Sequence, residues 1–255
     1  GNEVPAINTG KLVINEIHYH PSTSDPLDEF IEIYNPNAFP INLRGWKLSQ
    51  GIEFDFPDIT VDPNDYLIVS PAPQRILNRF KEDLSVVGPW RGQLSNQSDE
   101  IQLRDPDDKR VDRVIYADEG PWSRRVPSES DNGFTGWTWS DAHDGRGASL
   151  ELISTELSNN SGYNWTPSDA PWGSPGQINS AANLSPPPLI RAPRHSPLIP
   201  TSTDPIRIEA EIETIVGQSF EATLHYRIAT PDDTHPFGSI RMNDLGRDGD
   251  RTLSL

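Results

Sequence analysis

The chain has 255 residues, enough for one large or two modest domains, and its 38 acidic and 21 basic residues give a formal net charge of −17. This charge argues against nucleic acid or anionic membranes as partners, because both require basic side chains that neutralise phosphates. The absence of cysteine excludes disulfides and thiolate chemistry. No apolar run reaches the ~18 residues of a membrane-spanning helix. The 25 prolines and 18 glycines disfavour long helices, so we expect an all-β fold.

Residues 12–49 predict three consecutive strands. In the first, Val13, Asn15, Ile17 and Tyr19 alternate with the residues between them, and residues 30–34 show the same period of two. Turn residues at 35–37 and an extended segment from Pro40 close the unit. Alternation of this kind indicates strands with two distinct faces.

The rest of the first half predicts more short strands with turn residues between them. We expect strands at 52–57, 66–70, 100–103, 111–116 and 149–153, and one short helix at 74–83. The segments 100–103 and 111–116 flank the turn 105–108 and predict a hairpin. Residues 118–147 predict a long polar loop, which is usually functional or mobile. Strands at this spacing are typical of a sandwich.

A proline-rich segment, residues 183–205, predicts a semi-rigid extended linker between two domains. After it, residues 206–212, 222–228 and 239–242 predict three strands of a second β-domain. The 50 or so residues of 206–255 fall short of the ~100 that an immunoglobulin-type sandwich needs. We therefore expect this second domain to be incomplete and the chain to be a fragment of a longer polypeptide.

Eleven short motifs occur in an order that resembles one family. They are INEIHYHP (14–21), DEFIEIYN (28–35), LRGWKLS (43–49), FP (56–57), GQLSN (92–96), IQLRD (101–105), VDRVIY (111–116), GPW (120–122), GASLELI (147–153), NW (164–165) and GSPGQIN (173–179). Residues 10–180 thereby resemble the lamin tail domain, in the version found in bacterial extracellular proteins. The resemblance implies an immunoglobulin-like β-sandwich. Residues 206–255 more weakly resemble an immunoglobulin- or fibronectin-type module.

The resemblance also implies a function without catalysis. Lamin tail domains are structural and interaction modules, and bacterial ones accompany other domains on exported proteins. We therefore expect an extracellular or cell-envelope location in a bacterium. The expected partners are other domains of the same longer polypeptide or cell-envelope proteins. A shared fold does not transfer the nuclear role of lamins.

The first candidate metal site consists of Glu16, His18 and His20. At i, i+2 and i+4 on one strand these side chains share a face, and two histidines with a carboxylate are typical metal ligands. The alternative is that Glu16 satisfies backbone donors while the histidines lie at a strand end. A metal-dependent hydrolase at this position is the more remote functional alternative.

Acidic loops offer a second candidate, for Ca²⁺, the one cofactor that the sequence brings into consideration. Asp244, Asp248 and Asp250 cluster near the end of the chain, and Asp105, Asp107, Asp108 and Asp112 form a second group. Carboxylates and loop carbonyls bind Ca²⁺ with loose geometry, although the spacing differs from that of an EF-hand. The alternative is that these aspartates bond to their own backbone in turns.

Trp122, Trp137 and Trp139 form the third candidate site. Exposed aromatic side chains of a β-sandwich can stack on sugar rings, so a carbohydrate-binding accessory module is the main alternative function. The competing interpretation is that Trp122 packs against the sandwich and the other two hold the long loop to it. The chain has no nucleophile elbow, H-E-x-x-H or phosphate-binding loop, and we expect no catalytic residues.

Overall fold

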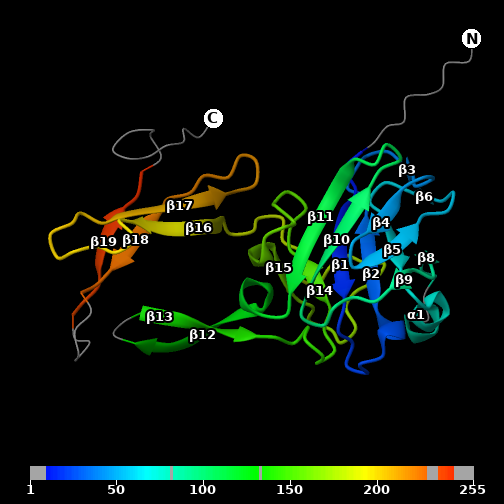
Figure 1. Cartoon of the computed structure of the whole chain (residues 1–255), viewed down its shortest axis with the longest axis horizontal. Coiled ribbons are helices and arrows are strands. Elements are labelled where there is room, and N and C mark those ends of the chain that lie inside the picture. Colours follow the sequence, from blue (N-terminus) through cyan, green and yellow to red (C-terminus); the bar gives the residue numbers. More distant parts are fainter. Residues whose placement is uncertain (1–9, 81–82, 132–133, 229–234, 244–255) are drawn as a thin grey trace, which may run out of the picture. The chain divides into compact units, whose positions relative to one another are not determined.

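The computed structural model describes residues 10–80, 83–131, 134–228 and 235–243 (Figure 1). The described chain forms two compact units. The first contains the described residues up to 126 together with 138–184, and the second contains 127–137 and the described residues from 185 onward. Each unit is described by itself.

The first unit contains a six-stranded sheet. Its strands lie in the order β15 (Trp165–Pro167), β14 (Leu150–Leu152), β1 (Val13–His18), β2 (Phe30–Tyr34), β7 (Tyr66–Val69) and β8 (Val86–Val87). The pairing is antiparallel except between β7 and β8, which are parallel. The central position of β1 explains why its six residues are all buried.

A five-stranded sheet faces the first one. Its order is β11 (Arg110–Ala117), β10 (Ser98–Arg104), β4 (Lys47–Ser49), β5 (Ile52–Asp55) and β9 (Arg91–Gly92). The predicted hairpin is confirmed, since β10 and β11 pair antiparallel over seven residue pairs. The short strands β3 (Ile41–Asn42) and β6 (Thr60–Val61) pair separately.

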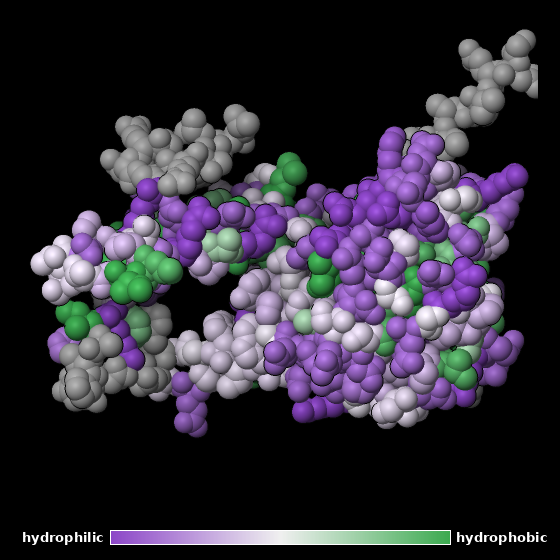
Figure 2. Space-filling view, viewed as in Figure 1, coloured by the Kyte–Doolittle hydropathy of each residue, from purple (hydrophilic) through white to green (hydrophobic). Residues whose placement is uncertain are grey.

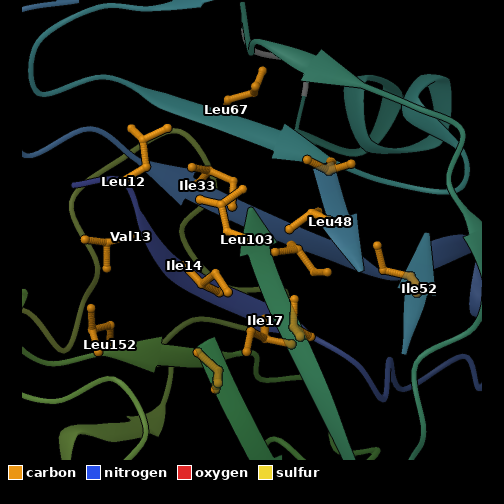
Figure 3. Packing of buried hydrophobic residues seen from close by; sticks show 14 of the residues in the cluster. Leu12, Val13, Ile14, Ile17, Ile33, Leu48, Ile52, Leu67, Leu103 and Leu152 are labelled. Atoms are coloured by element: carbon orange, nitrogen blue, oxygen red, sulfur yellow. The ribbon is translucent and has the colours of Figure 1, made fainter. Parts of the chain in front are cut away.

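The hydrophobic core lies between the two sheets. Ile14, Ile17 and Ile33 come from the first sheet, and they meet Leu48 and Leu103 from the second (Figure 3). All five side chains are buried. Burial of aliphatic side chains stabilises a domain by about 1.5–3 kcal/mol each, so this layer is the main source of stability. The prediction of an all-β, immunoglobulin-like sandwich is confirmed.

A β-bulge at Asn15 breaks the simple alternation predicted for β1. Ile14 pairs with Ile33 and Glu16 with Glu32, so that Asn15 is an extra residue without a partner in β2. As a result Ile14 and Ile17 both lie on the core face, although they are three residues apart. Glu16 and His18 lie on the opposite, outer face.

The outer face of the six-stranded sheet is covered rather than exposed. Helix α1 (Pro73–Phe80), which confirms the predicted helix, places Ile76 against Phe30 and Ile68.

The connections of the described chain also contain three short 3-10 helices: η1 (Pro26–Asp28), η2 (Gly120–Trp122) and η3 (Gly162–Asn164).

Residues 118–147 differ from the predicted long loop. They contain a hairpin of β12 (Arg124–Asp131) and β13 (Phe134–Ser140), which form a two-stranded sheet. The Thr and aromatic residues of 134–139 favour a strand, and this local preference outweighs the glycine and serine content of the segment.

From residue 185 onward, the described part of the second unit contains two two-stranded sheets, β16 (Leu189–Ser196) with β17 (Arg207–Glu213) and β18 (Thr223–Tyr226) with β19 (Gly238–Arg241). The three strands predicted after residue 206 are confirmed. Within 183–205, however, residues 189–196 are a paired strand and not a linker. Pro193 is tolerated because it lies in the register shift between Arg191 and Arg194 of a two-stranded sheet.

The face of the molecule seen in Figure 2 is mostly hydrophilic, with hydrophobic residues in small separate groups. This agrees with the acidic composition. Within the described residues, no helix is long and apolar enough to span a membrane.

Candidate functional site

Three glutamates occupy neighbouring positions on the outer face of the six-stranded sheet. Glu16 on β1 pairs with Glu32 on β2 and with Glu151 on β14, and all three side chains are 0% exposed. Directly opposed residues of adjacent strands have Cβ atoms about 4.5–5.5 Å apart. We call these residues the glutamate row.

A segment that we call the strap, residues 172–181, covers the glutamate row with hydrogen-bond donors. The backbone N–H of Ser174 donates to Glu16 Oε1 at 3.1 Å, that of Gly176 to Glu32 Oε2 at 2.6 Å, and that of Ala181 to Glu151 Oε2 at 2.9 Å. The hydroxyls of Ser174 and Ser180 also donate to Glu151. A Cβ on Gly173 would overlap Glu16 Oε1, so only glycine allows this close approach.

Burial has a direct electrostatic consequence for the glutamate row. It raises the pKa of Glu16 well above 4.5, with smaller contributions from the charges of Glu32 and Glu151. Burial likewise raises the pKa of Glu32 to about 8, although hydrogen bonds from Gly176 and Asn15 oppose the shift. The second oxygen of Glu16, Oε2, is buried and has no hydrogen-bond partner. The sheet therefore favours protonated over ionised carboxyl groups at these two positions.

The structure places the predicted metal ligands in different surroundings. Glu16 belongs to the glutamate row, and His18 is buried between the rings of Phe30 and Trp172, at centroid distances of 5.3 and 5.1 Å. Burial, followed by the charge of Arg79, lowers the pKa of His18 to about 3. His20 lies beyond the end of β1 and contacts Asp144 at 2.6 Å.

This geometry gives the predicted metal site no support. No three or more His, Asp or Glu side chains among the described residues are grouped so that they could hold a metal ion. Asp244, Asp248 and Asp250 lie outside the described residues, so calcium binding there stays a prediction. In the other acidic loop, Asp105 Oδ1 accepts hydrogen bonds from the backbone of Asp107 and Lys109, as the turn interpretation expects.

The three tryptophans differ in burial. Trp122 is buried at 6% exposure and packs on Trp165, with ring centroids 5.9 Å apart. Trp137 and Trp139 lie on β13 and are 57% and 44% exposed. Trp122 thus packs the sandwich, as the competing interpretation expected, and only Trp137 and Trp139 are accessible for stacking.

The edge strand β11 offers an accessible surface. It is the outermost strand of its sheet, and its eight residues make it the longest strand of the sandwich. A groove of about 260 Å³ runs beside it, lined by residues 110–113 and 158–160. Asn160 Oδ1 accepts a hydrogen bond from the Ile115 N–H at 3.0 Å, in the position that the carbonyl of an added strand would take. Arg110 is exposed at one end of the groove.

Sequence reasoning considered Glu16 as a metal ligand or as an acceptor for backbone donors, and it missed the glutamate row. The available signal is that Glu32 and Glu151 are flanked by apolar residues in FIEIY and LELI, and that Glu16 lies between Ile14 and Ile17 in INEI. A charged residue flanked in this way is predicted to be buried, and buried carboxylates need partners. The pairing of three distant strands, however, cannot be deduced from local patterns.

Comparison with protein families agrees with part of the resemblance. Residues 5–118 match the model of the Lamin Tail Domain family. The match therefore includes β1 to β11 and stops before β14, β15 and the strap. No curated protein matches the chain.

Proposed function

We propose that the chain is a non-catalytic structural and interaction module that uses the edge of β11 to pair with an extended segment of a partner. The match of residues 5–118 to the lamin tail domain, an immunoglobulin-like domain that is generally not catalytic, supports the module class. The observation that carries the choice of surface is the Asn160 cap on the Ile115 N–H. A side-chain amide there satisfies a donor that a strand would otherwise bond.

Strand addition at this edge requires residues 159 and 160 to give way, because Asn160 caps the Ile115 N–H and Asn159 donates to Asp112 Oδ2. The incoming carbonyl replaces Asn160 Oδ1, and the groove beside residues 110–113 accommodates side chains of the added segment. Arg110 is exposed there, whereas Arg113 is held by Glu100 at 2.7 Å. An acidic residue in the partner segment would meet Arg110.

A phage-displayed library of random nonapeptides, panned on the intact chain, tests this proposal. Ile115→Pro removes the outward N–H but no bond to β10, because Ile115 belongs to a pair whose N–H points away from β10. We expect selected peptides to lose at least tenfold in affinity for Ile115→Pro and to gain affinity for Asn160→Ala. Peptides that bind all three proteins equally would overturn the choice of edge.

We further propose that the module belongs to an exported or cell-surface bacterial protein and that its partners are neighbouring domains or envelope proteins. The resemblance of motifs such as INEIHYHP and GSPGQIN to bacterial extracellular lamin tail domains supports this. Fractionation of cells of the source organism with an antibody against the chain tests the location. Recovery only with cytosolic proteins would contradict it.

Carbohydrate binding is the second candidate function. The exposure of Trp137 and Trp139 on one strand favours it, because alternate residues of a strand point to the same face. A glycan array probed with wild type and with Trp139→Ala tests it. Binding that Trp139→Ala abolishes would favour this candidate, and an array without binding would exclude the glycans that it carries.

A further inference from the structure

The glutamate row lacks the positive charge that usually accompanies buried carboxylates. Among the described residues, Glu16, Glu32 and Glu151 form no ion pair with a basic side chain, and their polar contacts are hydroxyl, amide and backbone donors. The other titratable groups that act on the row are also acidic or neutral: Asp65 raises the pKa of Glu32, and Tyr66 on β7 lies close to it. Each further ionisation in the row therefore meets repulsion with no compensating cation.

Five hydrogen bonds join the strap to this row. Ser174, Gly176, Ser180 and Ala181 all donate to one of the three glutamates. Asn179 adds amide contacts, donating to the carbonyl oxygens of Asn15 and Leu152. The strap is thus held by many hydrogen bonds over a surface whose charge depends on pH.

The first turn of the strap provides a second anchor. Trp172 has a φ of +73°, its N–H donates to the carbonyl oxygen of Gly147 at 2.6 Å, and the guanidinium carbon of Arg79 lies 3.4 Å from its ring centroid. A left-handed backbone at a bulky residue is unfavourable in isolation, so packing holds it in place. These contacts of Trp172 do not involve the three glutamates, so ionisation of the row leaves the strap attached at this end.

We propose that the strap and the glutamate row form a pH-sensitive clasp, closed while Glu16 and Glu32 carry protons and opened when both ionise. Closed, the clasp excludes water from the outer face of β14, β1 and β2. Open, residues 173–181 leave that face, and water solvates the three carboxylates. The direction follows from geometry: ionised Glu16 and Glu32 would be like charges directly opposite each other on adjacent strands, fully buried and with no ion-pair partner among the described residues.

The proton balance sets the pH at which the clasp opens. The open form has carboxyl groups in water with ordinary pKa values near 4.5, whereas in the closed form the pKa of Glu32 is about 8 and that of Glu16 is raised. Closed chains therefore hold protons that open chains release, and rising pH favours the open form. We expect opening to develop as the pH passes from about 7 to above 8.

Hydrogen exchange of the intact chain, measured by mass spectrometry between pH 6 and 9.5 and corrected for the intrinsic pH dependence of exchange, tests the clasp. We expect protection of residues 173–181 to fall at least tenfold beyond the correction, while β10 and β11 stay protected. Unchanged protection of the strap over this range would overturn the proposal, as would loss of protection in strap and β10 together.

Three variants make the test specific. Glu32→Gln and Glu16→Gln keep the shape of the side chain but cannot ionise, so each should move the loss of strap protection upward by at least one pH unit. Glu29→Gln is the matched control, because burial also raises the pKa of Glu29 to about 8 but its carboxylate bonds the Leu94 N–H instead of the strap. Equal shifts in the control and in Glu32→Gln would overturn the clasp. If Glu16→Gln does not fold, Glu32→Gln and the wild-type profile still decide.

Discussion

The carboxylate of Asp112 on β11 accepts a hydrogen bond from the backbone N–H of Ile14 on β1 at 2.7 Å, and thereby joins the two sheets of the sandwich. The same oxygen accepts a hydrogen bond from Asn159 Nδ2 at 2.8 Å. This contact lies immediately before the bulge at Asn15, where β1 lacks regular pairing. The Asp112 carboxylate therefore satisfies the Ile14 N–H, which the irregular pairing of β1 leaves without a backbone acceptor.

Asp112→Ala should lower the free energy of unfolding by about 1–3 kcal/mol, because it leaves the Ile14 N–H without this acceptor and removes one of the two acceptors of Asn159 Nδ2. Urea denaturation of the first unit measures this. Asp107→Ala is the control: Asp107 is exposed in the adjoining turn, and its substitution should change stability by less than about 0.5 kcal/mol. Equal losses in both variants would contradict a special role for Asp112.

The stability of the fold should fall as pH rises from 6.5 to 8. In this window unfolded chains have released the protons of Glu16, Glu29 and Glu32, while folded chains retain them because the folded pKa of Glu29 and Glu32 is about 8 and that of Glu16 is also raised. The stabilisation is complete below the unfolded pKa of 4.5 and is lost as pH rises through the folded pKa. Each such proton contributes a slope of about 1.4 kcal/mol per pH unit.

Denaturation curves of Glu32→Gln across the same pH range check this expectation. The variant lacks one titrating group, so its stability should decline less steeply than that of wild type. Parallel declines would show that Glu32 is already ionised in the folded state.

His18 should make the fold less stable as the pH falls below 6.5, which is the opposite pH dependence to that of the glutamates. Its folded pKa of about 3 lies below the ordinary 6.5, so the unfolded chain takes up a proton first as pH falls. Stability from His18 is therefore present above pH 6.5 and is lost as pH falls toward 3. His18→Phe keeps a ring between Phe30 and Trp172 but cannot take up a proton. The difference in free energy of unfolding between this variant and wild type should therefore shift in favour of the variant when the pH is lowered from 7 to 5. A His18 ring proton resonance that titrates near pH 6.5 by NMR would refute this.

The two classes of tryptophan should separate in stability measurements. Trp122→Ala creates a cavity beside Trp165 and should cost about 3–5 kcal/mol. Trp139→Ala removes an exposed ring and should change stability by about 0.5 kcal/mol or less. Thermal and urea unfolding measure both, and a large loss in Trp139→Ala would mean that this ring packs a second element.

Calcium binding at Asp244, Asp248 and Asp250 is expected to raise the melting temperature in excess Ca²⁺ and lower it in EDTA, because a ligand bound only by the folded state stabilises it. The triple Asp→Asn variant should lose the response. A variant with Asp107→Asn, in the acidic turn that bonds its own backbone, should keep it. Identical melting curves of wild type with Ca²⁺ and with EDTA would end this hypothesis.

Much of the fold follows from local patterns, because strands such as 30–34 and 111–116 have alternating apolar residues and turn residues at their ends. The β12–β13 hairpin was missed because the glycine and serine content of its segment indicates a loop. The strand preference of Thr, Phe and Trp at 134–139 outweighs that signal in the structure. The strand at 189–196 was missed because prolines dominate its sequence, although a register shift accommodates Pro193.

The site was harder to predict than the fold. The pattern i, i+2, i+4 correctly places Glu16 and His18 on one face, but β1 ends at His18 and His20 lies apart. The true neighbours of Glu16 come from positions 32 and 151, which only long-range pairing brings together. No local pattern contains that information.

The bulge in β1 also has a consequence for insertions and deletions. Ile14, Glu16 and Ile17 pair with Ile33, Glu32 and Ile31, which are consecutive, so a chain without Asn15 could form the same ladder with every pair kept. Asn15 is therefore supernumerary for the sheet. A chain shortened at this position would lose instead the amide that donates to Glu32 and to Asn179, both at 2.8 Å. The extra residue lengthens β1 by one position. At that position the neutral amide of Asn15 connects Glu32 of the glutamate row to Asn179 of the strap.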